Sequence, residues 1–470
     1  MLPRFEVVAR RRPVDLVSPG SVLLDEPLGH GDGATGPTSG PTSGPSSGPT
    51  PVPTPHPAPY AAVVAELDTP PVTGRFAVGL CSGETRLAGW RDASGAIGLT
   101  VTAGGRTGDH RSRRHGRAPG TQPDLALTLT GTHVSVLTGR AGAWTVRGRV
   151  DLREVVDTRD EDWLAGLATG HRWTGAAAPP SGRLRAGGFG QLGLRDVRLV
   201  TRADGSAHPA EDGRLLLSAT SAGPGFFDTA HTSVWALDVA SLEVEHRSDL
   251  FFRRPDLPGV FGDHATHLLR DGDRWLVATS TWGDFDPRLP GARVATTIAS
   301  SDADLLRGRH VLDTSALPLP TGGLRSVGAW DPHLVREDGR WLVGFVNAER
   351  FFRFHPAIAE GPTLDALSLR AAAADRIATE GTTLARVDGS WRVLASDGRD
   401  GRRGQRRGYP AWDLDLAPAG SLDAPYVSNI PWPTLVPLED GWLLATFDGT
   451  PYGGPLPGYG THGDLVLMRT

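Results

Sequence analysis

Four carboxylic acids recur in the second half of the chain at nearly the same distance from a following turn. Asp196, Asp263 and Glu380 each lie eight residues before the aspartate of an Asp-Gly turn, and Asp331 lies seven residues before one. Equivalent placement in successive repeats predicts that the four carboxyls converge on one end of a common axis. Crowded carboxyls acquire separated pKa values, so one can donate a proton while another stays ionised. Hydrolysis of a glycosidic bond requires this pair of roles.

The acids belong to an internal repeat of a strand, an Asp-Gly turn and a second strand that usually opens with tryptophan. Asp-Gly between apolar strands is a strong hairpin signal, because both turn positions need φ > 0. The turns recur at intervals of 59, 67, 50 and 52 residues, which suits four-stranded propeller blades with variable outer loops. We predict five blades over residues 191–470; the alternative is an irregular β-sandwich with coincidental hairpins. The repeated segments begin at Asp212, Asp271, Asp338, Asp388 and Asp440.

The first 190 residues differ in composition from the repeats. Residues 1–59 are predicted to form an N-terminal tail and a linker rich in Pro, Gly, Ser and Thr, which has too few apolar side chains to build a core. Residues 60–190 carry short alternating strands separated by Gly-rich turns, which predicts a β-sandwich. This pattern resembles the concanavalin-like jelly rolls that accompany carbohydrate enzymes. The predicted fold is therefore all-β, with a jelly-roll sandwich before a five-bladed propeller.

Composition removes several kinds of chemistry and of partner. The sequence contains no lysine, so Schiff-base, pyridoxal-phosphate and P-loop lysine chemistry are excluded. Its single cysteine, Cys81, excludes an intramolecular disulfide. A net charge of −5 and the lack of an 18-residue apolar run predict no nucleic-acid partner and no membrane span. The start shows no apolar stretch of signal-peptide length, so we expect a cytoplasmic protein, or a secreted one if the start codon is misassigned.

Two of the acid-bearing strands resemble motifs of one enzyme family. Trp330-Asp331-Pro332, followed by LVREDGRW, is similar to the Asp-Pro strand of glycoside hydrolase family 43, and Glu380-Gly381, followed by TTLARVDGSW, is similar to that family's acid strand. The resemblance covers about 280 C-terminal residues. It implies a five-bladed propeller that inverts anomeric configuration and cleaves arabinofuranosides, xylosides or galactofuranosides.

The resemblance also implies roles for the acids. Glu380 would be the general acid, Asp331 would tune its pKa, and Asp263 would be the base. Asp196, which adds an earlier acid-bearing blade, is the rival for the base. The strand at Asp263 lacks the Asp-Pro dipeptide. When the repeats are aligned by the tryptophan after the turn, the position equivalent to Asp331 is Ala265.

Aromatic and histidine side chains near the same strands are candidates for binding a sugar. Aromatic faces with a few polar groups form sugar subsites. Tryptophans that open the second strands of the repeats are instead expected to pack between blades. The same is expected of His267, and it is the alternative to substrate binding for His333. The substrate-binding candidates are Trp282, Trp330, Trp432, His264 and His333, with Trp412 as a further platform residue, and the blade-packing tryptophans are Trp275, Trp341, Trp391 and Trp442.

No cofactor is expected to be required, although the resemblance allows a structural Ca²⁺, with His462 as the candidate histidine near the axis. The arginine-rich run at 399–407 is expected to be a solvated loop or to border the funnel and contact an anionic or extended glycan. The predicted partner is an oligo- or polysaccharide. The alternatives are a non-catalytic carbohydrate-binding propeller and a retaining, fructosidase-like or phosphorolytic propeller enzyme. The retaining fructosidase family is disfavoured because its Asn-Asp-Pro-Asn-Gly and Glu-Cys motifs are missing.

Overall fold

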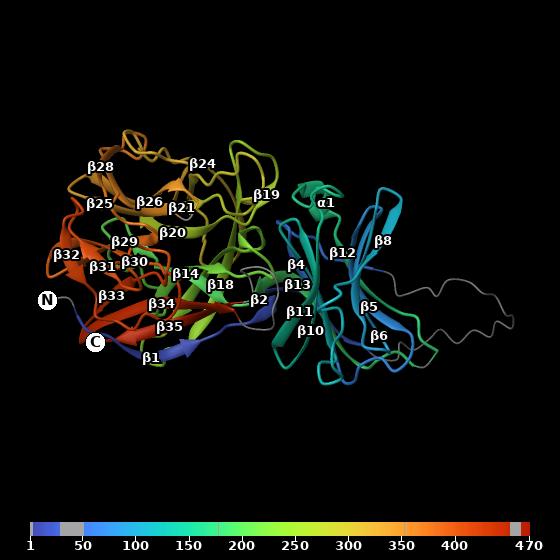
Figure 1. Cartoon of the computed structure of the whole chain (residues 1–470). Helices are drawn as coiled ribbons and strands as arrows, with labels where there is room; N and C mark the ends of the chain where they lie inside the picture. Colours follow the sequence, from blue (N-terminus) through green and yellow to red (C-terminus); the bar gives the residue numbers. More distant parts are fainter. Residues whose placement is uncertain (1–2, 29–50, 177, 352, 452–461) are drawn as a thin grey trace, which may run out of the picture. The chain divides into compact units, whose positions relative to one another are not determined.

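The computed structural model describes residues 3–28, 51–176, 178–351, 353–451 and 462–470. These residues form two compact units, one that contains residues 14–191 and one that combines residues 1–13 with the chain from residue 192 onward. Strands dominate both units (Figure 1), and the described helices are the short α1 (Glu161–Ala165) and the 3-10 turn at Phe227–Thr229. The predicted all-β class is confirmed. No helix in the described ranges is both long and apolar enough to cross a membrane.

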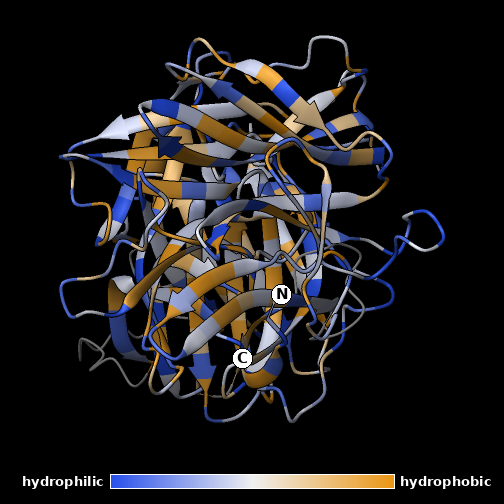
Figure 2. Cartoon of the chain, turned by 90° about the vertical axis from the view of Figure 1, so that its left-hand side faces the viewer, coloured by the Kyte–Doolittle hydropathy of each residue, from blue (hydrophilic) through white to orange (hydrophobic). Residues whose placement is uncertain are grey.

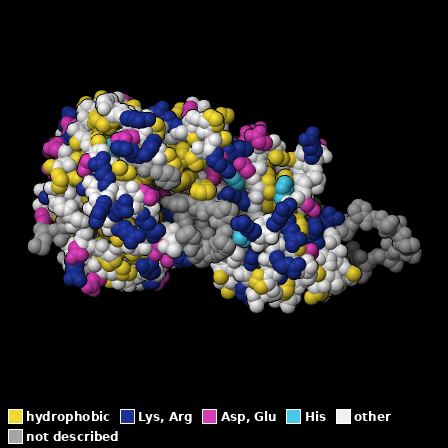
Figure 3. Space-filling model, viewed as in Figure 1, with side chains coloured by type: hydrophobic (Ala, Val, Ile, Leu, Met, Phe, Trp, Pro, Cys, Tyr) yellow, Lys and Arg dark blue, Asp and Glu magenta, His cyan; other side chains and the backbone are white. Residues whose placement is uncertain are grey.

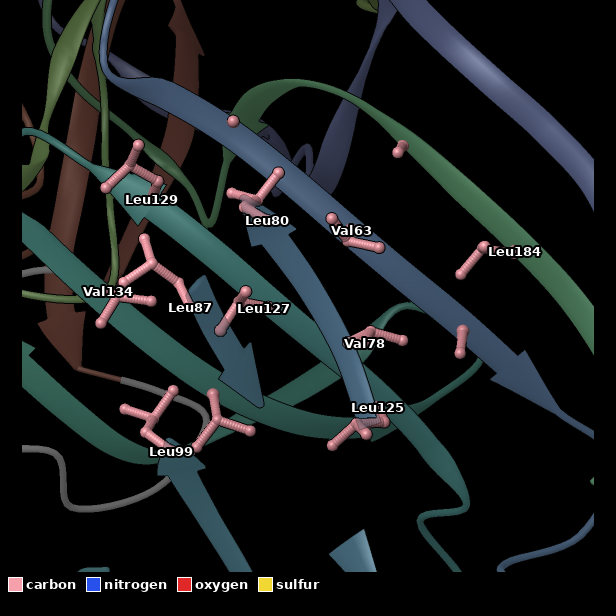
Figure 4. Packing of buried hydrophobic residues seen from close by; sticks show 14 of the residues in the cluster. Val63, Val78, Leu80, Leu87, Leu99, Leu125, Leu127, Leu129, Val134 and Leu184 are labelled. Carbon is pink, nitrogen blue, oxygen red and sulfur yellow. The ribbon is translucent and has the colours of Figure 1, made fainter. Parts of the chain in front are cut away.

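The first unit is a sandwich of two six-stranded sheets that share one core. Alternate residues of facing strands, such as Val63 and Leu127 from one sheet and Val78 and Leu80 from the other, meet in this core (Figure 4). One sheet has the order β11 (Ala143–Asp151), β10 (His133–Arg140), β9 (Asp124–Thr130), β4 (Tyr60–Leu67), β13 (Gly182–Gln191) and β2 (Asp15–Leu28). The other has the order β3 (Val52–Pro53), β12 (Ala168–Trp173), β5 (Arg75–Ser82), β6 (Thr85–Asp92), β7 (Ile97–Ala103) and β8 (Arg106–His110).

The second unit consists of five sheets, which we number I to V in chain order. Sheet I contains β14 (Leu194–Leu199), β16 (Leu215–Ser221), β17 (His231–Leu237), β18 (Val244–Arg253), β19 (Val260–Phe261) and β23 (Gly308–Asp313). Sheet II contains β15 (Thr201–Arg202), β20 (His264–Asp271), β21 (Arg274–Ser280), β22 (Thr296–Ser301) and β24 (Ser315–Ala316). Sheet III contains β25 (Gly328–Glu337), β26 (Arg340–Arg350), β27 (Arg353–Gly361) and β28 (Ser368–Ala372). Sheet IV contains β29 (Thr379–Val387), β30 (Ser390–Asp397), β31 (Pro410–Trp412) and β32 (Pro418–Ser421). Sheet V contains β33 (Thr434–Leu438), β34 (Gly441–Pro451), β35 (His462–Arg469) and β1 (Glu6–Arg11).

Neighbouring sheets of this unit pack through their first long strands. β14 contacts β20 and β33, β20 contacts β25, and β25 contacts β29. In Figure 2, hydrophobic stretches alternate along the strands with neutral and hydrophilic ones. Trp275 and Trp341 are buried in the clusters between sheets, and Trp391 and Trp442 pack against such clusters, which confirms their predicted packing role. Trp412 is also buried between sheets, so it is not a platform for a sugar.

The prediction that residues 1–59 form a tail and a linker is wrong for the described N-terminal strands. β1 forms the outer strand of sheet V by antiparallel pairing with β35, and β2 pairs with β13 in the sandwich. The partners of both strands lie more than 150 residues further along the chain. Because no local hairpin signal marks such pairings, the sequence pattern alone did not reveal them.

Candidate active site

The first long strands of sheets I to IV share an irregularity that positions the site. In each strand the ladder register shifts across the same three-residue step. One residue within each step adopts a left-handed conformation, with φ between 51° and 74°. A bulge of this kind bends the strand and redirects the side chains beside it. The left-handed residues are Asp196, Ala265, Asp331 and Gly381, and the residues directly before them are Arg195, His264, Trp330 and Glu380.

All eight of these residues except Gly381 line one pocket. Three acids therefore meet there, Asp196 from β14, Asp331 from β25 and Glu380 from β29, as the repeat predicted for these three positions. The remaining wall is largely aromatic and apolar. It includes Phe227, Trp282, Phe351, Phe354, Ile430 and Trp432.

Glu380 is in the state that a general acid needs. Its side chain is half-buried, and the indole Nε1–H of Trp330 donates to its Oε2 over 3.4 Å. Burial and, to a smaller extent, the negative charge of Asp196 raise the pKa of Glu380 to about 8, against the opposing effects of Trp330 and Arg195. At neutral pH the carboxyl therefore holds a proton that it can donate.

Asp331 lies beneath Glu380 and holds its strand in place. The side chain is 1% exposed, and the backbone N–H of Gly381 donates to its Oδ2 over 3.4 Å. Its own backbone N–H donates to Ser280 Oγ of sheet II over 3.0 Å. Burial, reinforced by Glu380, raises the pKa of Asp331 well above its ordinary value, while Arg198 opposes this shift. Asp331 and Glu380 therefore titrate as a pair rather than singly.

A buried arginine ties the acid-bearing strands together. The Arg198 guanidinium donates to the backbone carbonyls of Asp331 and Thr382, each over 3.0 Å, and stacks over the Trp432 ring at 4.6 Å. Burial lowers the pKa of Arg198 to about 10, although Asp331 and Asp196 raise it, so the cation persists at neutral pH. The composition required that any cationic side chain beside these acids be arginine or histidine, and the structure places an arginine there.

Asp263 does not reach the pocket, which corrects the prediction that it is the base. The carboxylate is completely buried, accepts Arg254 Nε–H over 2.8 Å in a two-point ion pair, and accepts the Gly283 backbone N–H over 3.0 Å. These contacts are all with protein groups, and Asp263 is not among the residues that line the pocket. The bulge equates Asp196 with Ala265, so Asp263 lies two residues outside the equivalent position.

His264 and His333, both predicted to bind substrate, lie in different places. His264 lines the pocket, and burial lowers its pKa to about 3, helped by Arg195, so the ring is neutral. Its Nδ1–H faces the Gly262 carbonyl at 3.1 Å, which leaves Nε2 as an acceptor. His333 instead lines a separate cavity among the Asp-Gly turns. Its Nδ1 accepts the Leu384 backbone N–H over 3.3 Å, so it packs between sheets, as the alternative reading held.

The aromatic candidates lie at the pocket but are nearly covered. Trp282 stacks on Phe227 at 4.7 Å, and Trp330 and Trp432 are 3% and 2% exposed. Trp432 lies against Gly381 of the acid-bearing strand and against the Arg198 guanidinium. Sequence reasoning missed Arg195, Arg198, Asn429 and the phenylalanines of the wall. The arginines flank Asp196 in Arg195-Asp196-Val197-Arg198, a signal that was present in the sequence.

The predicted structural Ca²⁺ has no visible ligand set. The described part of the chain contains no group of three or more His, Cys, Asp or Glu residues that could hold a metal ion. The side chain of His462, the predicted histidine for that role, lies outside the described residues.

The raised pKa of Glu380 predicts a basic limit of activity. Because only its protonated form can donate, kcat/KM is expected to fall about tenfold per pH unit above pH ~8. A pH–rate profile of the wild-type protein checks this. A profile that stays flat to pH ~10 would show that no group with this pKa is needed.

Gly381 is required both for its conformation and for space. Its φ is +74°, and an added Cβ would lie 2.4 Å from the Trp432 ring. We expect Gly381→Ala to displace the neighbouring Glu380 and to lower kcat by about 10²-fold, because small misplacements of a catalytic group have effects of this size. Gly339→Ala, also at positive φ but with open space around it, is the matched control and should keep its kcat. Equal kcat for both variants would contradict the proposed packing.

The described fold resembles solved carbohydrate enzymes. The catalytic domain of a Coprinopsis cinerea glycoside hydrolase family 62 α-L-arabinofuranosidase matches with a TM-score of 0.37 and 11% identity, over 60% of this chain and 92% of that one. RS223 β-xylosidase matches at 0.40 and 14%, over 59% and 92% of the two chains. A family 43 enzyme from Xanthomonas citri complexed with xylose matches at 0.40 and 16%, over 59% and 87%.

No protein-family model and no curated protein matches this chain. TM-scores and identities as low as those above carry no argument about function.

Proposed function

We propose that this protein is a glycoside hydrolase in which Glu380 is the general acid and Asp196 the general base. The observation that supports this most directly is the convergence of three carboxyls from equivalent bulges on one pocket, with Glu380 held protonated at neutral pH. A protonated carboxyl and an ionised carboxyl in one pocket are what glycoside hydrolysis uses.

In the proposed reaction, Glu380 gives its proton to the leaving oxygen as the bond between this oxygen and the anomeric carbon breaks. A water molecule attacks the anomeric carbon, and Asp196 takes the proton that the water loses. Asp331 is a positioning residue, because it holds the Gly381 backbone beside the acid. Arg198 donates hydrogen bonds to the backbone carbonyls of Thr382 and Asp331, and its positive charge offsets the negative charge of the site. Proton exchange with solvent then restores both carboxyls.

The same proposal includes the finer fold and the stereochemistry. Sheets I to V would be the blades of a five-bladed propeller, since their first strands contact one another in series. The sandwich would be a concanavalin-like jelly roll. Attack by water from the face opposite the leaving group would invert the anomeric configuration, whereas attack by a carboxylate would retain it. NMR of the first-formed product anomer distinguishes the two.

A screen of nitrophenyl glycosides tests the activity. The panel contains the arabinofuranoside, xyloside, galactofuranoside and fructoside, each assayed with wild-type protein and with Glu380→Gln. Turnover of one or more glycosides that falls in the variant supports the proposal. Binding of a sugar without turnover of any glycoside would instead favour a non-catalytic carbohydrate-binding protein.

A further inference from the structure

The loop of residues 399–407, which we call the arginine loop, borders the candidate active site. It follows β30, whose last residue Asp397 pairs with Thr379 beside Glu380. The Gly398 backbone N–H donates to the Ala378 carbonyl over 2.7 Å, and Ala378 and Asp400 both line the pocket. The Arg399 backbone N–H donates to the side chain of Asn429, another pocket residue, over 2.9 Å.

The loop carries a net positive charge, because it contains five arginines and one acid, Asp400. Its five arginines are all exposed, and within the described residues none of them forms an ion pair. Other surface arginines do, for example Arg214 with Asp212 and Glu245. The loop is nevertheless anchored, since the Gln405 side chain donates to Asp375 and the Arg407 backbone N–H donates to the Asp397 carbonyl over 2.9 Å. Figure 3 shows arginine side chains gathered on parts of this unit's surface.

The position of the loop relative to Glu380 indicates on which side of the pocket the positive charge lies. Glu380 and the arginine loop belong to the same sheet, IV, while three aromatic residues of the wall, Phe227, Trp282 and Phe351, come from the loops of sheets I to III. A general acid lies beside the leaving oxygen. The arginine loop therefore lies on the side of the pocket from which the leaving group departs.

We infer that the leaving-group side of the substrate is anionic, a sugar that carries a carboxylate or a sulfate. Guanidinium groups bind both anions through paired N–H donors. This inference rests on the proposed function in one respect: the role of Glu380 as general acid decides which side of the substrate carries the charge. The aromatic wall would then receive the neutral sugar whose glycosidic bond is cleaved.

Paired substrates test the inference. For the sugar found by the screen, kcat/KM is measured on the 4-nitrophenyl glycoside and on its 3-carboxy-4-nitrophenyl counterpart, with wild-type protein, Arg402→Ala/Arg403→Ala and Arg113→Ala/Arg114→Ala. The last variant removes an adjacent exposed pair of arginines from the sandwich and is the matched control. For two unit charges that act over roughly 8 Å in water, Coulomb's law gives an expected fall in the relative kcat/KM on the carboxylate substrate of about fivefold at low salt.

The neutral glycoside should be cleaved equally by all three proteins, and the control variant should keep the wild-type ratio. An unchanged ratio in the arginine-loop variant, or an equal change in the control, would overturn the inference while leaving the proposed function intact. If no glycoside is turned over, the proposed function fails. Calorimetry that compares the binding of a galacturonate trimer with that of its carboxyl-reduced form then decides whether the arginine loop binds anions. Preference for the acid that is lost in Arg402→Ala/Arg403→Ala upholds an anion site, and equal binding of both trimers overturns it.

Discussion

Glu380→Gln is expected to lower kcat by about 10⁴-fold on a disaccharide and by about 10²-fold on the matching nitrophenyl glycoside. The difference arises because nitrophenolate leaves without much help, whereas a sugar alkoxide must be protonated as it departs. Glutamine preserves the size of the side chain and its contact with Trp330. Binding of the substrate should therefore change little, and the basic limb of the pH–rate profile should disappear. Steady-state kinetics on the two substrates provides the measurement.

The matched control for this prediction is Glu439→Gln, the same substitution at an exposed position in the turn of sheet V. It should leave both rates unchanged. Equal losses on the two substrates in Glu380→Gln would contradict a proton-donating role. Such a result would point to Glu380 as a group that positions the substrate or attacks it.

Arg198→Met is expected to lower the free energy of unfolding by about 3 kcal/mol. The substitution leaves the buried carbonyls of Asp331 and Thr382 without their donors and removes the cation beside the acids. The pKa of Asp331 should rise further, because Arg198 is what lowers it. Chemical denaturation and the pH–rate profile measure the two effects.

Arg274→Met, at an exposed position of β21, is the control and should change stability by less than about 0.5 kcal/mol. Arg198→Lys separates charge from geometry. It keeps the cation but loses the planar fork, so it should recover part of the pH profile and little of the stability. Wild-type stability in Arg198→Met would contradict the role assigned to this side chain.

The repeat predicted which strands carry the acids, because Asp-Gly turns mark hairpins in the local sequence. It could not predict the bulge, in which one residue of each strand adopts a left-handed conformation. Because of the bulge, residues at the same distance from the turn do not occupy equivalent positions in the strands. Asp263 was therefore placed in the ring of acids, although it lies outside the equivalent position and is held by Arg254. Pairing of β1 with β35 was missed for a related reason, since no local pattern specifies a partner at the other end of the chain.

The lack of lysine in the sequence restricts which cationic side chains can lie in the site, but it says little about the fold. It leaves arginine and histidine as the cationic side chains available to the acids, and Arg198 and Arg195 occupy such positions. Sequence order alone could not show that Arg198 is buried, because its neighbours are contributed by sheets III, IV and V.

The central claim, that Asp196 and Glu380 form the acid–base pair, is tested most directly by comparing Asp196→Asn with Asp263→Asn on the glycoside that the screen identifies. Rates are expressed per folded molecule, with the folded fraction taken from circular dichroism, because Asp263→Asn breaks a buried ion pair and should cost about 3–5 kcal/mol of stability. We predict that Asp196→Asn lowers kcat by about 10³-fold and that folded Asp263→Asn keeps kcat within about threefold of wild type. Loss of kcat in folded Asp263→Asn, with Asp196→Asn unaffected, would contradict this account.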